Sequence, residues 1–429
     1  EQISAKAFSD CINLSDIKLG DNVASISANA FDNTSYYNNL NNWENDILYI
    51  GNHLIKAKEN VNGECIVRSG TKTISHNAFS HCKYLEKVVM PDGLLSIGIG
   101  AFYNSGISEA IIPDSVTNIG VNTFALCKKL KEVKLSSNIK EIPSNLFNDC
   151  SGLQNISLPD GITNIGDNAF LRCYALTEII IPDSVEHIGE NAFRDCYGLE
   201  NVKLSEKMTE LSNNLFSNCS ALKNVLMPNS IMSVGSSVFS DCRNLKNVKF
   251  SESLKSIGSS AFLRCYRLEE VDLPETLIEI SPRAFLGCSL LSEIEFPGSI
   301  KTISYGILTG CAGLEKVIIN EGTQIINTID MGGCRYLYIP KSTIQINAEI
   351  FFNIMIAQCC EYEFKENVCF LKSNDNNKCP VIIYYPAEGD TLWEIAKMYK
   401  STCKDIISVN SLTSESLEGV KVLLLPKKR

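Results

Sequence analysis

Apolar and polar residues along this chain follow a pattern that recurs about every 23 residues. In one clear copy the apolar positions are Leu176, Ile179 and Ile181, an L-x-x-I-x-I spacing. Alternation of this kind predicts a short strand with one buried face. Pro182 follows directly, and a proline ends a strand because it has no N–H for the next ladder bond.

Each copy continues with a second apolar pair, such as Val185 and Ile188, and often a glycine such as Gly189. An Asn-Ala-Phe sequence or a close variant comes next. The phenylalanine is expected to fill the space between successive copies. The asparagines suit the start of a short helical turn. They include Asn29, Asn77, Asn168 and Asn191.

Cysteine marks the period most clearly. Ten cysteines stand 23 residues apart from Cys127 to Cys334, and Cys11 and Cys82 occupy the same repeat position upstream. A fixed period of this length indicates one structural unit copied and stacked, with each unit covering the apolar face of its neighbour. The predicted fold is therefore a repeat solenoid, mostly β with short helical turns.

The cysteines are predicted to be small buried fillers rather than reactive groups. Stacked units lie about 4.8 Å apart, which is too far between parallel Cβ atoms for ordinary disulfide geometry. We therefore expect the twelve thiols of the column to be reduced. Reduced thiols fit a cytoplasmic protein, or one exported by an organism that lives without oxygen.

The period is broken in two places. Residues 36–67 hold two apolar runs, Ile47–Ile50 and Leu54–Ile55, around Gly51-Asn52, which predicts an inserted hairpin. A binding knob and an inert insertion both remain open for this stretch. Between Phe102 and Phe124 the repeat is one residue short, so Ile107 is expected to take the usual leucine position.

The last part of the chain differs in kind. A strand is predicted at 381–385 and a helix at 389–399 with a Thr391–Glu394 capping box at its start. A second helix is predicted from Thr402 to near Asn410, and a closing strand at 420–426. This order is βααβ. The predicted domains are a solenoid at 1–346 with its irregular insert at 36–67, a terminal cap or linker at 347–380, and the small module at 381–429.

The repeated Asn-Ala-Phe-x-x-Cys-x-x-Leu-x-x-Ile-x-Ile-Pro-x-x-Val-x-x-Ile-Gly unit resembles the BspA-type leucine-rich repeat family over about residues 1–350. The resemblance implies a surface protein of a bacterium or protozoan, concerned with adhesion and protein binding.

The C-terminal module resembles the LysM family through Gly389-Asp390-Thr391-Leu392-Trp393, Asp405-Ile406-Ile407 and Leu425-Pro426. The resemblance implies binding to the N-acetylglucosamine chains of peptidoglycan or chitin. It also allows a protein-docking role, which such modules have in assemblies. Glu418-Gly419-Val420 stands where the family usually has Pro-Gly-Gln. The implied glycan-binding residues are Gly389, Asp390, Thr391, Leu392, Asn410, Leu412 and Thr413.

Charge and length narrow the function. The chain has 429 residues and a net charge of −10 without long blocks of one sign, which disfavours a nucleic-acid partner. No segment has the 18 or more apolar residues that membrane insertion requires. The chain begins inside a repeat without a signal peptide, so we expect it to be part of a longer protein. A cell-surface or extracellular location is favoured, and a cytoplasmic one stays open.

Catalytic and metal chemistry is not predicted. The four histidines form no H-E-x-x-H motif and pair with no G-x-S-x-G motif. We therefore expect no enzyme activity, no metal site and no cofactor.

The outward strand positions are the predicted protein-binding surface. Positions four, five and seven after each cysteine should point away from the core, and two residues at position seven are apolar near two asparagines at position five. These residues are Ile180, Asn201, Asn224 and Leu226. One hypothesis is a binding and adhesion protein whose solenoid contacts an unidentified protein ligand while the module holds cell-wall glycan. The other is a structural scaffold in which the module docks to protein.

Overall fold

The structure is a computed structural model that describes most of the repeat region and parts of the C-terminal region. The described residues are 1–20, 22–327, 336–338, 340, 342–343, 345–347, 355–358, 361–365, 368–372, 381–384, 391–398, 402–410, 412, 414–416 and 423–426. For the strands beyond residue 327 and for residues 398 and 408–410 only the backbone is described. The chain divides into two compact units, 1–228 and 229–429.

In the first unit, each coil contributes one strand after the cysteine position. We call this row of parallel strands the first sheet. Its members are β6 (Gly63–Ile66), β8 (Leu85–Val89), β10 (Glu109–Ile111), β12 (Glu132–Lys134), β14 (Asn155–Ser157), β16 (Glu178–Ile180), β18 (Asn201–Lys203) and β20 (Asn224–Leu226). The register advances by one repeat at each step, so Glu132 lies opposite Asn155 and Glu178 opposite Asn201. The predicted strand is confirmed, with Ile179 buried between exposed neighbours.

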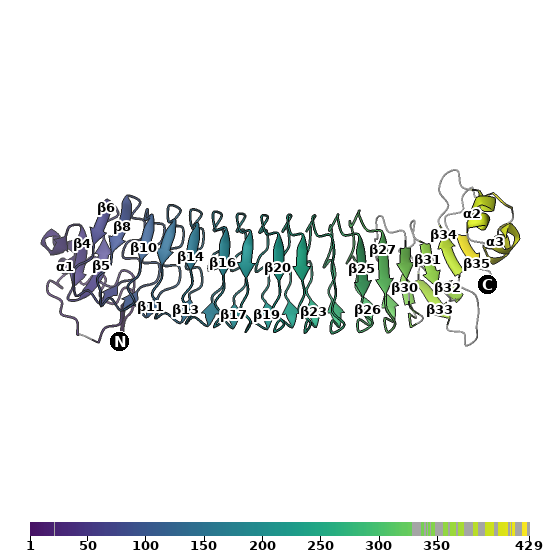
Figure 1. Cartoon of the computed structure of the whole chain (residues 1–429). Helices are drawn as coiled ribbons and strands as arrows, with labels where there is room; N and C mark the ends of the chain where they lie inside the picture. Colours follow the sequence, from purple (N-terminus) through teal and green to yellow (C-terminus); the bar gives the residue numbers. More distant parts are fainter. Residues whose placement is uncertain are drawn as a thin grey trace. The chain divides into compact units, whose positions relative to one another are not determined.

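Each coil also has a second strand, of two residues, which the sequence did not predict; it ends on the later residue of the second apolar pair, as Ile188 ends β17. These two-residue strands pair in parallel and make a second sheet along another side of the coils (Figure 1). Its members in the first unit are β7 (Thr73–Ile74), β9 (Ser96–Ile97), β11 (Asn118–Ile119), β13 (Glu141–Ile142), β15 (Asn164–Ile165), β17 (His187–Ile188) and β19 (Glu210–Leu211).

The loop that closes each coil carries the phenylalanine. Phe170 is fully buried and stacks on Phe147 and Phe193, with ring centroids 5.3 and 5.1 Å apart. Its backbone N–H donates to the Ala192 carbonyl of the next coil at 2.8 Å. The core is therefore a column of stacked phenylalanine rings. It is enclosed by the two sheets and by the loops, whose backbone hydrogen bonds join each coil to the next.

The asparagines begin short hydrogen-bonded turns, as when the Asn168 carbonyl accepts from the Leu171 N–H at 3.1 Å, but the expectation that they act as helix N-caps is wrong. Asn77, Asn168 and Asn191 have φ values of 55°, 56° and 57°, and Asn29 has 59°. An N-cap residue would instead have extended backbone angles. No helix is assigned in the described loops that contain these residues. Asparagine tolerates the left-handed region better than most residues, which explains its place at this tight turn.

The irregular insert is confirmed as a hairpin. Strands β4 (Ile47–Ile50) and β5 (His53–Ala57) pair antiparallel around Gly51, whose φ is +56°. The insert also holds helix α1 (Ser35–Asn38), a 3₁₀ turn at Leu40–Asn42 and strand β3 (Trp43–Glu44). Trp43 is half-buried, packs edge-on against Tyr37 at 5.3 Å and donates its indole N–H to the Tyr37 carbonyl. This packing favours the structural role of the insert over a binding knob.

The chain's first coil pairs β1 (Gln2–Ile3) with β2 (Ser25–Ile26). Cys11, expected to be buried, is exposed there.

The second unit continues both kinds of strand. One row contains β22 (Asn247–Lys249), β25 (Glu293–Phe296), β27 (Lys316–Ile319), β29 (Tyr336–Tyr338) and β31 (Met355–Gln358). The other contains β21 (Ser233–Val234), β23 (Ser256–Ile257), β24 (Glu279–Ile280), β26 (Thr302–Ile303), β28 (Ile325–Ile326) and β30 (Gln345–Asn347).

Pairing changes from parallel to antiparallel at the C-terminal end of the second unit. β33 (Val368–Lys372) pairs antiparallel with β30 and with β32 (Glu361–Lys365). β34 (Val381–Tyr384) pairs antiparallel with β31 and with β35 (Leu423–Pro426). Helices α2 (Leu392–Met398) and α3 (Cys403–Asn410) lie between β34 and β35 in sequence, which confirms the βααβ order.

Candidate functional site

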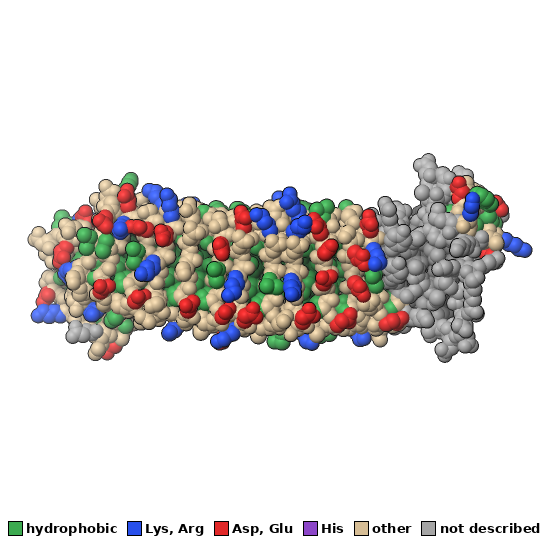
Figure 2. Space-filling view, viewed as in Figure 1, with side chains coloured by type: hydrophobic (Ala, Val, Ile, Leu, Met, Phe, Trp, Pro, Cys, Tyr) green, Lys and Arg blue, Asp and Glu red, His purple; other side chains and the backbone are tan. Residues whose placement is uncertain are grey.

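The outward face of the first sheet is the larger candidate surface. Strand alternation points Val133, Ile179 and Val225 inward and leaves their two neighbours on each strand exposed. Lysines, carboxylates and apolar side chains are interspersed over the molecular face seen in Figure 2. Many charges are paired, as in Lys223–Glu200 at 2.7 Å. The inward positions are fixed by packing, whereas the outward positions are free to vary with function.

All four predicted protein-binding residues lie on this outward face. Ile180 and Leu226 are 55% and 63% exposed, and Asn201 and Asn224 are also exposed. The register places Lys203 directly opposite Ile180. β18, which carries Lys203, lies between β16 and β20, so Ile180 and Leu226 do not form one continuous apolar patch.

The acidic strand positions of the second unit are partly neutralised. Lys246 lies 3.2 Å from Glu269, and Lys316 lies 2.5 Å from Glu293. Among the residues that the structure describes, no group of three or more His, Cys, Asp or Glu side chains could hold a metal ion.

The cysteine column makes a contact that sequence reasoning missed. The Cys173 thiol donates to the Phe147 carbonyl oxygen of the preceding coil at 3.2 Å, and the Cys196 thiol donates to the Phe170 carbonyl in the same way. The described cysteines are free, and those from Cys82 to Cys311 are buried. Cys334 lies outside the described residues. These carbonyls also accept a backbone N–H, that of Cys150 at Phe147 and that of Cys173 at Phe170, so each thiol adds a second hydrogen bond to the loop and satisfies its own buried S–H.

Burial makes these thiols poor nucleophiles. It raises the pKa of the Cys196 thiol to about 12 and that of Cys127 to about 11, while Cys173 and Cys265 shift well above the usual value. Only the thiolate attacks disulfide reagents. In the folded protein these groups therefore remain protonated at neutral pH.

We expect the buried cysteines to be inert to Ellman's reagent at about pH 8 in the folded protein and to react fully once denaturant is added. Because the folded-state pKa is raised, the thiols contribute stability below their ordinary pKa of 9.0. That contribution is lost as the pH rises through about 12. Fast reaction of the column cysteines in the native protein, or their absence from the unfolded thiol count without reductant, would contradict this account.

The C-terminal module is built around two capped helices. The Glu394 N–H donates to the Thr391 hydroxyl at 3.3 Å, and that hydroxyl donates to the Glu394 carboxylate at 2.8 Å, which confirms a capped helix start. Thr402 and Asp405 repeat the arrangement at α3. Between the helices lies a small apolar cluster of Leu392, Ile395, Ala396 and Ile406 with Cys403, Ile407 and Leu412 against it.

The predicted glycan-binding residues differ in how far they are buried and in whether the structure describes them. Leu392 is buried in the apolar cluster and Leu412 packs against it, so their side chains hold the module together. Thr391 is exposed beside its cap. Asn410 ends α3, and its side chain is not described. Gly389, Asp390 and Thr413 lie outside the described residues.

Trp393, one of the residues that carry the LysM resemblance, is a surface residue that was not among the expected glycan-binding residues. It is 61% exposed next to Leu392, with the Lys397 ammonium 5.0 Å from the ring centroid. The helical pattern could have indicated its exposure, because Trp393 follows the buried Leu392 and lies with the exposed Glu394 on the polar side of α2. An exposed aromatic ring beside the helix start offers a flat apolar surface to a ligand.

Family models describe most of the chain. The BspA type leucine rich repeat region (6 copies) matches overlapping segments at 1–98, 49–177, 119–245, 163–290 and 209–337. The LysM domain matches residues 387–426. No curated protein matches the chain.

Several solved structures contain similar coils. A leucine-rich repeat protein from Bacteroides ovatus is 22% identical with a TM-score of 0.53, over 72% of this chain and 87% of that one. A leucine rich cell surface protein from Faecalibacterium prausnitzii is 24% identical with a TM-score of 0.42, over 71% and 86%. The pneumococcal vaccine antigen PcpA is 18% identical with a TM-score of 0.45, over 73% and 92%. The Bacteroides structure supports the leucine-rich repeat fold.

Proposed function

The chain belongs to the BspA-type leucine-rich repeat family and carries a LysM domain near its C-terminus, and from this premise we propose that it is a non-catalytic adhesion protein of the cell surface. In this proposal the first sheet contacts a protein ligand, and the LysM domain binds cell-wall glycan that contains N-acetylglucosamine. Both families are binding or repeat domains, so a binding role is their common property.

The observation that carries the proposal is the pairing of these two surfaces on one chain. The coils fix the inward residues through the phenylalanine and cysteine columns and leave the outward strand positions unconstrained by packing. An array of this kind suits the display of an extended binding surface. No helix in the described part of the chain is long and apolar enough to cross a membrane. In this proposal the LysM domain supplies the link to the surface.

For the glycan site we retain the loop before α2 and the loop after α3. The proposed contacts are Gly389, Asp390, Thr391, Asn410 and Thr413, with the backbone of Leu392 and Leu412. Exposed Trp393 is added because it adjoins this loop. Peptidoglycan and chitin share the N-acetylglucosamine unit that such a site would recognise.

For the protein ligand we propose contacts at Ile180, Asn201, Asn224 and Leu226, with Lys203 between the two apolar residues. The proposed domains are a solenoid at 1–346, a cap or linker at 347–380 and the LysM module at 381–429. A reduced thiol column at the surface is compatible with an organism that grows without oxygen, and that habitat is part of the proposal.

Retention of the protein on insoluble peptidoglycan tests the proposal that the LysM domain binds glycan. We expect the full chain to sediment with peptidoglycan and to be displaced by soluble N-acetylglucosamine oligomers. The Trp393→Ala and Asn410→Ala variants should be retained several-fold less, because each removes a contact from the proposed groove. Lys404→Ala is the matched control, since Lys404 is exposed on α3 away from these loops.

The same experiment separates the two hypotheses. If the full chain stays in solution while a standard LysM protein is retained, the anchoring half of the proposal is wrong and the module docks to protein instead. Equal loss of retention in all three variants would mean that the module is unfolded rather than altered at a site. Circular dichroism and thermal unfolding of each variant therefore accompany the assay.

A further inference from the structure

Three exposed apolar side chains lie side by side near one end of the first sheet. Ile66, Val89 and Ile111 are 72%, 37% and 54% exposed. Ile66 lies opposite Val89, and the pairing of Ala110 with Val88 places Ile111 opposite Val89 on the other side. These are three neighbouring strands with no polar residue interposed. This column is therefore continuous, unlike the pair Ile180 and Leu226.

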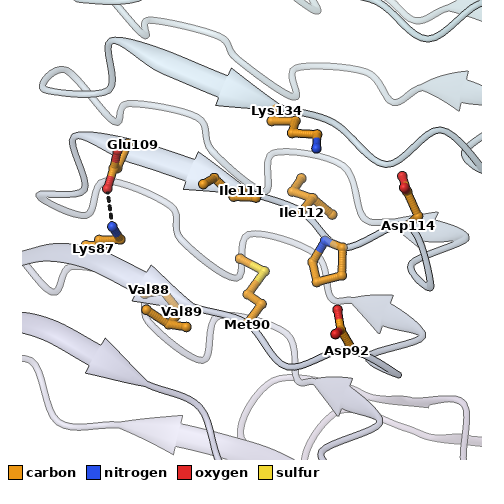
Figure 3. Close-up of a pocket in the computed structure, with 11 residues that line it drawn as sticks. Lys87, Val88, Val89, Met90, Asp92, Glu109, Ile111, Ile112, Asp114 and Lys134 are labelled. Atoms are coloured by element: carbon orange, nitrogen blue, oxygen red, sulfur yellow. Dashed lines mark ion pairs between the residues drawn. The ribbon is translucent and has the colours of Figure 1, made fainter.

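A depression opens on this column. It has a volume of about 390 Å³ and spans β8, β10 and β12. Met90 and Ile112 are buried residues of its floor, and Val89 and Ile111 reach into it from adjacent strands (Figure 3). This volume falls in the lower part of the range of roughly 300–1,000 Å³ that is common for ligand sites.

The charges around the depression are arranged unequally. On one side Lys87 is held by Glu109 at 2.6 Å and by Glu64 at 3.9 Å, so its charge is compensated (Figure 3). On the opposite side the exposed carboxylates of Asp92 and Asp114 come from adjacent coils.

Asp114 is held in position on that acidic side. Its Oδ1 accepts from the Ser137 N–H at 2.8 Å and from the Ser137 hydroxyl at 2.9 Å. Lys134 completes the lining, so two lysines face three carboxylates. The complement of this surface is an apolar group next to a cation.

We propose that this depression docks an extended segment of a partner protein in which large apolar side chains lie next to a lysine or arginine. The apolar side chains would cover Val89 and Ile111, and the cation would reach Asp92 and Asp114. The column Ile66–Val89–Ile111 spans two strand spacings, about 10 Å, which an extended segment covers with about three residues. This inference rests on the proposed protein-binding role of the first sheet and places the contact on β6 to β12.

A selection of random displayed peptides of about twelve residues against the intact chain tests this. We expect the enriched peptides to combine Leu, Ile, Phe or Trp with Lys or Arg. A synthetic peptide taken from the enriched set should bind about tenfold or more weakly to the Ile111→Ser variant, because the apolar contact is lost. Asp92→Asn should weaken binding several-fold, and added salt should do the same.

The chain supplies matched controls. Ile278→Ser removes a comparably exposed isoleucine outside the proposed binding residues, and Asp183→Asn alters the repeat position of Asp92 in a later coil; both should leave peptide binding unchanged. All four substitutions are at exposed residues, so each variant should fold.

Several outcomes would overturn the inference. Enrichment of acidic peptides, no enrichment, or equal binding to the parent chain and Ile111→Ser would each do so. Loss of binding in Ile180→Ser alone would place the protein contact at the Ile180–Leu226 region, so the proposed function would stand while this inference fell. If sedimentation showed a dimer that Ile111→Ser dissociates, the column would be a self-association surface instead.

Discussion

Replacing Phe170 with alanine is expected to destabilise the protein by about 3–5 kcal/mol, the usual cost of removing a buried phenylalanine. Phe170 is fully buried and contacts a stacked ring on each side, so the substitution opens a cavity in the middle of the column. The backbone bond from Phe170 to Ala192 and its counterparts in adjacent coils hold the loop at a fixed spacing, which limits collapse into the cavity.

Tyr174→Ala is the matched control for this prediction. Tyr174 also stacks on a ring in the next coil, with Tyr197 5.0 Å away, but it is 38% exposed. Its loss should cost about 1 kcal/mol or less. Urea unfolding gives the comparison, and hydrogen exchange around residues 147–193 shows whether the effect is local, since repeat arrays do not always unfold in one step. Similar losses for the two variants would contradict a core carried by the phenylalanine column.

Gly106→Ala is expected to have the second largest effect, about 3 kcal/mol. Gly106 lies in the coil that is one residue short, directly after Ser105, which takes the place of the column cysteine and lies 3.4 Å from the Cys127 sulfur. A Cβ at Gly106 would stand 2.1 Å from the Lys83 carbonyl oxygen. The backbone of two adjacent coils would have to separate, which would also strain the bond from the Gly106 N–H to the Cys82 carbonyl.

Gly161→Ala tests whether the close approach, rather than glycine itself, is responsible. The nearest atom to a Cβ at Gly161 is the flexible Lys140 ammonium nitrogen at 3.5 Å. The free energy of unfolding of the Gly161→Ala variant should therefore differ from that of the parent chain by less than about 1 kcal/mol. A small gain in stability is expected because alanine restricts the unfolded chain. Thermal unfolding of the two variants decides the matter. Equal stability would mean that the short coil relaxes without cost.

The sequence predicted the coil well because its buried residues recur at fixed spacing. The inward Leu, Val or Ile, Phe and Cys positions could all be assigned by adding the repeat length, and Ile107 fills the leucine position as expected. The second sheet was missed because its strands are only two residues long, too short for alternation to be visible. The cysteine-to-carbonyl bonds join groups 26 residues apart, as in Cys173 and Phe147, and depend on the three-dimensional loop.

The candidate surface was only partly predictable for a related reason. Alternation identified Ile180 and Leu226 as outward residues, which the structure confirms. The continuous apolar column Ile66–Val89–Ile111 could not be predicted from the sequence. Ile66 lies in the insert, where the 23-residue period fails and the strand register shifts between Gly63 and Glu64. Pairing with β8 is what brings Ile66 beside Val89.

The most direct test of the functional account is hydrogen–deuterium exchange of the full chain with and without an N-acetylglucosamine oligomer. In the proposed function, the LysM domain binds glycan and the first sheet binds protein. The proposed function therefore predicts added protection confined to peptides within 387–426 and unchanged exchange across the coils at 47–320. Protection on the strands of the first sheet, or no protection anywhere at an oligomer concentration that saturates a standard LysM protein, would contradict it.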